Sequence, residues 1–185
     1  MKKLLLSIAV LCTTAIVSKA QMAAGDFHFG AGIHLGLPIG DFHNVSSFGI
    51  GGELQGEYAF TENVTGVATT GYTYFAGKSI DLGGGDSYKA NYGHIPVLVG
   101  ARYYATEQVF FGAQIGYGHY SVSISSNVQG FTGASGGSGG FEYRPQVGYN
   151  ANPVQFILSY DGTSVSGGTF SQIGLYAIYT FGGGK

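Results

Sequence analysis

Cysteine is almost absent from this chain of 185 residues, because Cys12 is the only one and it lies in an apolar N-terminal segment. Residues 21–185 therefore contain no disulfide, no zinc finger and no cysteine nucleophile. Charged side chains make up only 10% of the residues, whereas a soluble domain carries about 25%. A net charge of −2 gives no support for nucleic-acid binding.

Long apolar runs are also missing, since no stretch of 18 apolar residues follows residue 20. Aromatic residues nevertheless make up 15% of the chain, and there are 34 glycines. This composition has too little polar side-chain surface for a soluble domain. In a bilayer every backbone polar group must find a partner within the protein, so a membrane protein without helical spans is a closed β-barrel.

The first twenty residues have the three parts of a secretory signal peptide. Two lysines precede an apolar stretch from Leu4 to Val17, which is too short to span a membrane, and small residues stand at the −3 and −1 positions if cleavage follows Ala20. A lipoprotein signal ending at Cys12 is a poorer match, because Leu11 is bulky where a small residue is needed. We expect a cleaved signal peptide at 1–20 and a single domain at 21–185.

Residues 26–37 alternate between two faces, as a strand with one oily side does. One face is apolar and the other small or polar: Phe27, Phe29, Ala31, Ile33, Leu35 and Leu37 against His28, Gly30, Gly32, His34 and Gly36. Similar alternation predicts further strands at 48–60, 64–75, 94–104, 109–120, 141–149 and 154–160, and a last one after residue 169. It is weakest at 64–75, where Val64, Ala68, Tyr72 and Tyr74 are assigned outward and the reverse facing stays open. The fold class is therefore all-β, an eight-stranded antiparallel up-and-down transmembrane β-barrel.

The predicted connections alternate in length. Loops of 9 to 19 residues (38–47, 76–93, 121–139 and 161–169) alternate with turns of three or four residues (61–63, 105–108 and 151–153). Bacterial barrels have short periplasmic turns and longer external loops, so both termini are expected on the periplasmic side. An inner aromatic girdle would then include Tyr58, Phe60, Tyr103 and Phe111.

Two segments carry a resemblance to a known family. Residues 95–104, Ile-Pro-Val-Leu-Val-Gly-Ala-Arg-Tyr-Tyr, and residues 173–181, Ile-Gly-Leu-Tyr-Ala-Ile-Tyr-Thr-Phe, resemble strands of the small OmpA/OmpX-like outer-membrane β-barrel proteins, especially the Bacteroidetes type. The resemblance spans 26–181 and implies a Gram-negative outer membrane, contact with its lipid and lipopolysaccharide, and recognition of the last strand by the assembly machinery. Here Gly-Gly-Gly-Lys follows Phe181, so that recognition signal is internal.

Five charged residues are expected to face the lumen: Glu53, Glu57, Arg102, Glu142 and Arg144. An eight-stranded barrel is just wide enough to be filled by side chains, and unpaired buried charges are costly, so these residues should form Glu–Arg pairs. Counting from the turns places Glu57 and Arg102 low, and Glu53 and Arg144 nearer the middle. Glutamines 55, 114, 146 and 155 would support this plug, which is either a structural network or the gate of a narrow pore.

Other candidate sites carry weaker signals. His119 and Ser121 share a face and resemble part of the hydrolytic set of lipid A deacylases, but the acid is missing. Asp81 and Asp86 fit no established calcium loop. We expect no cofactor, no metal and no enzymatic activity.

The predicted function is a structural scaffold in the outer membrane whose loops serve adhesion or bind an envelope or extracellular protein. A narrow porin-like channel for ions or small solutes is the alternative, and a lipid A-modifying enzyme is the third interpretation. Membership of a secretion or assembly complex also stays open.

Overall fold

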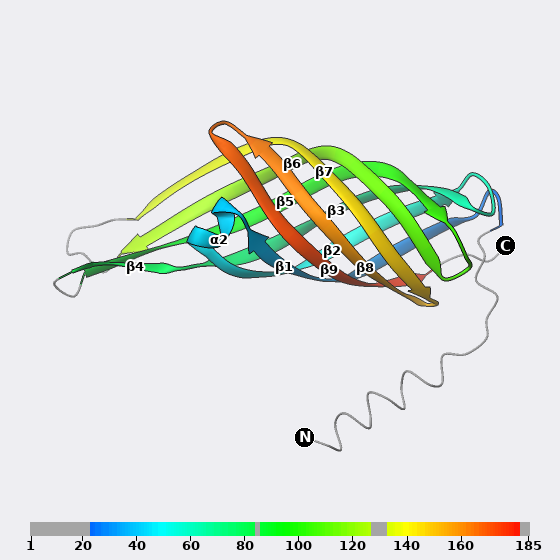
Figure 1. Cartoon of the computed structure of the whole chain (residues 1–185), viewed down its shortest axis with the longest axis horizontal. Helices are drawn as coiled ribbons and strands as arrows, with labels where there is room; N and C mark the ends of the chain where they lie inside the picture. Colours follow the sequence, from blue (N-terminus) through cyan, green and yellow to red (C-terminus); the bar gives the residue numbers. More distant parts are fainter. Residues whose placement is uncertain (1–22, 84–85, 127–132, 182–185) are drawn as a thin grey trace, which may run out of the picture.

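Nine strands and one short helix form within residues 23–83, 86–126 and 133–181, which this computed structural model describes (Figure 1). They are β1 (Phe27–Ile39), α2 (Asp41–Val45), β2 (Ser46–Ala59), β3 (Val64–Gly77), β4 (Ser79–Gly83), β5 (Asp86–Tyr104), β6 (Val109–Ser126), β7 (Ala134–Ala151), β8 (Val154–Val165) and β9 (Gly168–Phe181). The predicted signal peptide at 1–20 lies outside the described residues. Within those residues, no helix is long and apolar enough to cross a membrane.

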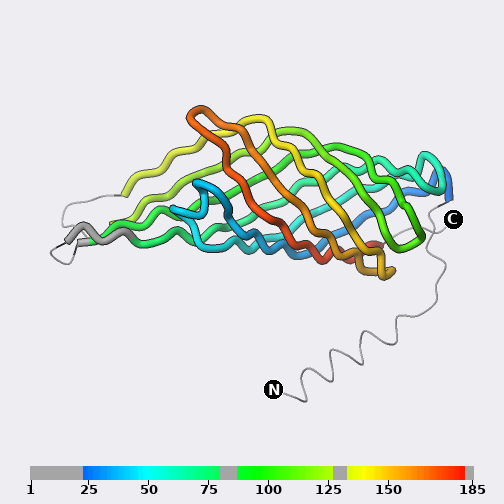
Figure 2. The backbone as a smooth tube through the Cα atoms, in the orientation of Figure 1, coloured from blue at the N-terminus to red at the C-terminus, as the bar shows by residue number. Residues whose placement is uncertain are grey.

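The strands close into an antiparallel barrel (Figure 2). The first and last strands pair, with Gly32 opposite Ile178, and this closes the sheet. β3 pairs with β5, with Thr69 opposite Leu98, so these two strands are neighbours in the barrel wall. β4 pairs with the part of β5 that extends beyond this wall. The wall therefore has the eight strands that the alternation predicted, and the fold class is confirmed.

The predicted faces are confirmed along the wall. Ile33 is 61% exposed while its neighbour His34 is 3% exposed. On β3, Tyr72 is 50% and Thr73 is 2% exposed, which confirms the outward assignment of Tyr72 and Tyr74. Large apolar side chains from every wall strand thus form a continuous belt on the outside, while the polar side chains lie inside.

The two ends of the barrel differ. Phe27 and Phe181 lie at the end with the three short turns, which we call the terminal end. Helix α2 and strand β4 lie at the opposite, distal end (Figure 1). Beyond the last β7–β8 pair, Phe141 with Ser164, three strands and β4 continue as an open sheet. We call this sheet the distal extension: Ser79–Gly83, 86–92, 119–126 and 134–139.

The prediction of long loops was wrong for 76–93, 121–139 and 161–169. Most of 76–93 and 121–139 is strand. The ladder between β5 and β6 continues to the pair Tyr88–Ser126, and the ladder between β6 and β7 continues to the pair Ile124–Ala134. These serine- and glycine-rich segments need no apolar face, since both faces of the extension are outside the belt. Residues 161–169 continue β8 and β9 around a turn in which Gly167 has φ +99°. The loop at 38–47 contains α2.

Candidate functional site

The lower lumen, toward the terminal end, is built around Arg102. Its guanidinium donates to Glu57 Oε2 at 3.0 Å and to Gln55 Oε1 at 2.8 Å. Glu57 also accepts hydrogen bonds from the hydroxyls of Thr65 and Tyr104. Arg102 and Glu57 are each 1% exposed, so this pair is fully desolvated and depends on these hydrogen bonds to offset the cost of burial.

The middle of the lumen is built around Arg144. Its Nη1 donates to Glu53 at 2.6 Å, its Nε lies 2.8 Å from an oxygen of Asp161, and its Nη2 lies 3.6 Å from Glu142. One guanidinium therefore faces three carboxylates. Glu142 has a second partner, since its Oε2 lies 2.8 Å from Nε2 of His94.

The structure brings all five predicted lumen residues inside the wall, and it adds two that the sequence did not identify. The sequence predicts Asp161 as the first residue of the loop 161–169, whereas it is 1% exposed on β8, in the lumen. His94 is predicted only as the first residue of the strand 94–104, whereas it is buried in the lumen beside Glu142. The alternation Ser159, Asp161, Thr163 continues the inward face of β8 and is the signal that would have identified Asp161.

Aromatic side chains close the distal mouth of the lumen. Phe42, on α2, is 1% exposed and packs edge-on against Phe75 and Phe170, with ring centroids 5.1 and 4.9 Å apart. Tyr92 and Tyr120 complete the contact. We call this group the aromatic cap: Phe42, Phe75, Tyr92, Tyr120 and Phe170. Helix α2 is thus held over the mouth of the barrel by the buried Phe42 ring and by hydrogen bonds from Lys78 to the carbonyl oxygens of His43 and Val45.

An apolar floor lies toward the terminal end. Phe110, Ile157 and Ile178 are buried there beside Tyr104 and Tyr176. The guanidinium of Arg102 lies 4.7 Å above the Phe110 ring, a cation–π contact that fixes its lower side. The charged middle of the lumen is therefore enclosed between two apolar layers.

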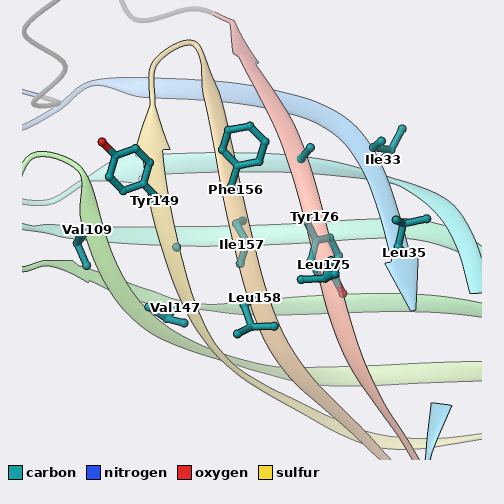
Figure 3. Close-up of a pocket in the computed structure, with 12 residues that line it drawn as sticks. Ile33, Leu35, Val109, Val147, Tyr149, Phe156, Ile157, Leu158, Leu175 and Tyr176 are labelled. Carbon is teal, nitrogen blue, oxygen red and sulfur yellow. The ribbon is translucent and has the colours of Figure 1, made fainter. Parts of the chain in front are cut away.

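An apolar hollow on the outer surface has no charged residue, histidine or serine in its lining. This hollow of about 550 Å³ crosses β1, β9, β8, β7 and β6 and is lined by belt side chains such as Leu35, Leu158 and Leu175 (Figure 3). His119 and Ser121 also point outward, on β6, while Glu142 is held inside by His94 and Thr163. Within the described ranges, no three His, Cys, Asp or Glu residues are placed to hold a metal ion.

The second candidate site is the edge of the distal extension that β7 forms. β7 pairs with β6 along its whole length, but its ladder with β8 starts only at Phe141. Among the residues that the structure describes, 134–139 therefore have a neighbouring strand on one side only, as Figure 1 shows where β7 runs beyond the β8–β9 hairpin. We call residues 134–139 the β7 edge. Their sequence, Ala-Ser-Gly-Gly-Ser-Gly, has no charge and no proline.

The direction of the free backbone groups follows from the register. The N–H of Asn150 donates to Gln108, on the β6 side. Backbone groups alternate in direction along a strand, so the N–H and C=O groups of Ser135, Gly137 and Gly139 point away from β6. Pro145 fits this alternation, because the β7–β8 ladder is interrupted where its N–H is missing.

No protein-family model and no curated protein sequence matches the chain. Its fold is similar to those of several solved structures, and three of them serve as examples. Ail of Yersinia pestis has a TM-score of 0.63 at 17% identity, covering 85% of this chain and 99% of Ail. The N-terminal barrel domain of Pseudomonas aeruginosa OprF has 0.56 at 12%, covering 85% and 99%. Neisserial surface protein A has 0.52 at 16%, covering 84% and 96%. The chain therefore has the fold of small outer-membrane β-barrels, and the OmpA/OmpX-like resemblance is confirmed at the level of fold.

Proposed function

We propose that this chain is an integral protein of the Gram-negative outer membrane whose barrel is a structural scaffold and whose distal extension binds an envelope or extracellular protein. The observation that carries the proposal is the β7 edge, which offers a row of backbone groups outside the belt that no described strand pairs with. Such edges are templates for pairing with another chain. Ail, a barrel of similar fold, has been solved in complex with the heparin analogue sucrose octasulfate, which supports ligand recognition by a barrel of this kind.

The belt supports the membrane location. Exposed side chains such as Phe29, Leu54 and Val99 are each more than half exposed, and in water this surface would cost about 25 cal/mol for each Å². Lipid chains remove that cost, so phospholipid and lipopolysaccharide are the expected neighbours of the belt. The short turns favour a periplasmic terminal end, and residues 173–181 are the segment that we expect the assembly machinery to recognise.

Cysteine labelling tests both the location and the orientation. Residues 21–185 contain no cysteine, so Ser135→Cys and Glu107→Cys each introduce a single thiol, at the β7 edge and in the turn after β5. In intact cells a membrane-impermeant maleimide should label Ser135→Cys fully and leave Glu107→Cys unlabelled, since only the distal end faces the medium.

Lysed cells provide the control, because both thiols should then react. Labelling of Glu107→Cys but not Ser135→Cys in intact cells would reverse the orientation. Equal labelling of both in the soluble fraction would contradict the membrane location.

A narrow channel is the second candidate function. It is favoured by buried polar atoms that have no hydrogen-bond partner among the described residues, such as the side-chain amide of Gln172 and Nε2 of His34. Such atoms usually bind internal water. The filled charged layer and the aromatic cap oppose this interpretation, because side chains occupy both the middle and the mouth of the lumen.

Planar-bilayer recording separates the two functions. We expect no single-channel steps from the wild type, and none from Arg102→Ala or Phe42→Ala. The aromatic cap, the charged residues and the apolar floor each fill the lumen, and each variant removes a side chain from only one of these three layers. Steps in the wild type, with a conductance that Arg102→Ala changes, would establish the gated pore and remove the scaffold interpretation of the lumen.

A further inference from the structure

We propose that the partner of the β7 edge is a second copy of this chain, which pairs antiparallel with the first and belongs to a facing membrane. This inference rests on the proposed function, because it names the partner of the surface-interaction site. It follows from the chemistry of the edge, from the register that two copies can adopt, and from the direction of the strands.

The two borders of the distal extension differ in chemistry. Natural proteins protect strand edges with charges, prolines, bulges or very short strands. β4 has such protection, since it is five residues long, contains Asp81, follows Lys78 and has a register shift between Asp81 and Gly83. The β7 edge has neither a charge nor a proline, and its register with β6 runs without a shift. The chain thus protects one border and leaves the other open to pairing.

The β7 edge can pair with itself in register. Hydrogen-bonded pairs must join residues whose backbone groups point outward on both strands, and these are Ser135, Gly137 and Gly139. When the Gly137 residues of the two copies face each other across a two-fold axis, Ser135 of each copy lies opposite Gly139 of the other. All three outward residues of both copies then form hydrogen bonds. Because the central residues are glycines, the two backbones can approach without side-chain overlap, and no like charges meet.

The strand direction decides how the two barrels are placed. A two-fold axis that relates antiparallel strands is perpendicular to those strands. The strands of the extension continue the wall strands, which run from one end of the barrel to the other (Figure 2). Two copies paired in this way therefore point in opposite directions. Barrels in one membrane point in the same direction, so the pairing suits copies in two membranes that face each other.

Six residues span about 20 Å of strand, so a single pair of edges makes a short contact. Many copies on each surface would act together, because each pair formed holds the next copies close to their partners. The expected result is adhesion between surfaces that both carry the protein, rather than a stable dimer in detergent.

Clustering of vesicles tests this proposal. Phosphatidylcholine vesicles carrying the full chain should cluster with each other, as measured by dynamic light scattering, and should not cluster with protein-free vesicles. Gly137→Pro should reduce the clustering rate at least tenfold, because it removes the central outward N–H. It should still fold, since that N–H has no partner on β6 and proline is tolerated at such edge positions.

Gly137→Ala is the matched control, because it adds a Cβ at the same place and keeps the N–H. That Cβ would lie 3.0 Å from the ring of His119, which is exposed, and 3.2 Å from the backbone oxygen of Tyr120, so the strands must shift by a few tenths of an ångström. Clustering should therefore persist in this variant. Absence of clustering in the wild type, wild-type rates for Gly137→Pro, or clustering with protein-free vesicles would each overturn self-pairing.

The outcomes distinguish this inference from the proposed function. If vesicles fail to cluster while a foreign extended peptide binds the wild type and not Gly137→Pro, the surface-interaction function stands and the second copy is wrong as the partner. If the maleimide fails to reach Ser135→Cys in intact cells, the proposed function fails as well.

Discussion

Replacement of Arg144 by methionine is expected to be the most destabilising substitution in the lumen. The guanidinium is shared by Glu53, Glu142 and Asp161, and methionine would leave these buried carboxylates without it. Breaking a buried ion pair by removing one partner costs about 3–5 kcal/mol, and here one removal affects three partners. We expect the variant to lose at least this much unfolding free energy, or to fail to fold, as measured by urea unfolding of the protein refolded into lipid vesicles.

Arg102→Met is the matched control, because it removes an equally buried guanidinium that faces a single carboxylate. Glu57 would keep its hydrogen bonds from Thr65 and Tyr104, so the loss should be smaller than for Arg144→Met. Glu107→Gln, at an exposed turn, should leave the unfolding free energy within about 0.5 kcal/mol. Equal losses for both arginine variants would contradict the shared role of Arg144.

The wall could be predicted from the sequence because a membrane gives each strand two chemically different sides. Ile33 must lie against lipid and His34 must lie inside, so a period of two residues is imposed along the whole span. A slip by one residue would exchange these faces. The alternation therefore identified all eight wall strands, while the facing of 64–75, where it is weakest, was left open until the structure placed Tyr72 outside and Thr73 inside.

The distal extension could not be predicted because that constraint ends with the belt. In β7 before Phe141, only alanine, serine and glycine occupy a strand that is held by its backbone ladder to β6. Such residues are equally typical of solvated loops. The β7 edge, which carries the proposed function, was therefore hidden in a segment whose side chains have no strand pattern.

The lumen was predicted in part. Arg102 and Glu57 could be brought together because both lie a few residues from a short turn, which fixes their height. Asp161 lies far from any short turn at the terminal end, and a carboxylate followed by glycine is also a common loop sequence. The aromatic cap depends on where α2 folds back, and no local pattern around Phe42 indicates that position.

Gly118→Val is expected to separate Glu142 from its partners. Gly118 faces the lumen on β6, between β5 and β7, and Glu142 crosses it to reach His94. A Cβ at this position would overlap Glu142 Oε2 and lie 2.9 Å from the side chain of Thr163. The carboxylate would have to move, and a buried charged group that loses its hydrogen bonds costs about 3 kcal/mol or more. We expect a loss of that size in the free energy of unfolding.

Gly52→Val is the control. It shows whether the loss in Gly118→Val comes from the contact with Glu142 or from placing a valine at any strand glycine of the barrel. Gly52 lies on β2, where the only neighbour of an added Cβ is the Gly32 carbonyl oxygen at 3.5 Å, an ordinary contact. Valine favours strands, so the unfolding free energy of Gly52→Val should equal or exceed that of the wild type in the same urea titration. Equal unfolding free energies for Gly118→Val and Gly52→Val would contradict this prediction. Glu142 would then not need the space above Gly118, and its contact with His94 would contribute little to the stability of the barrel.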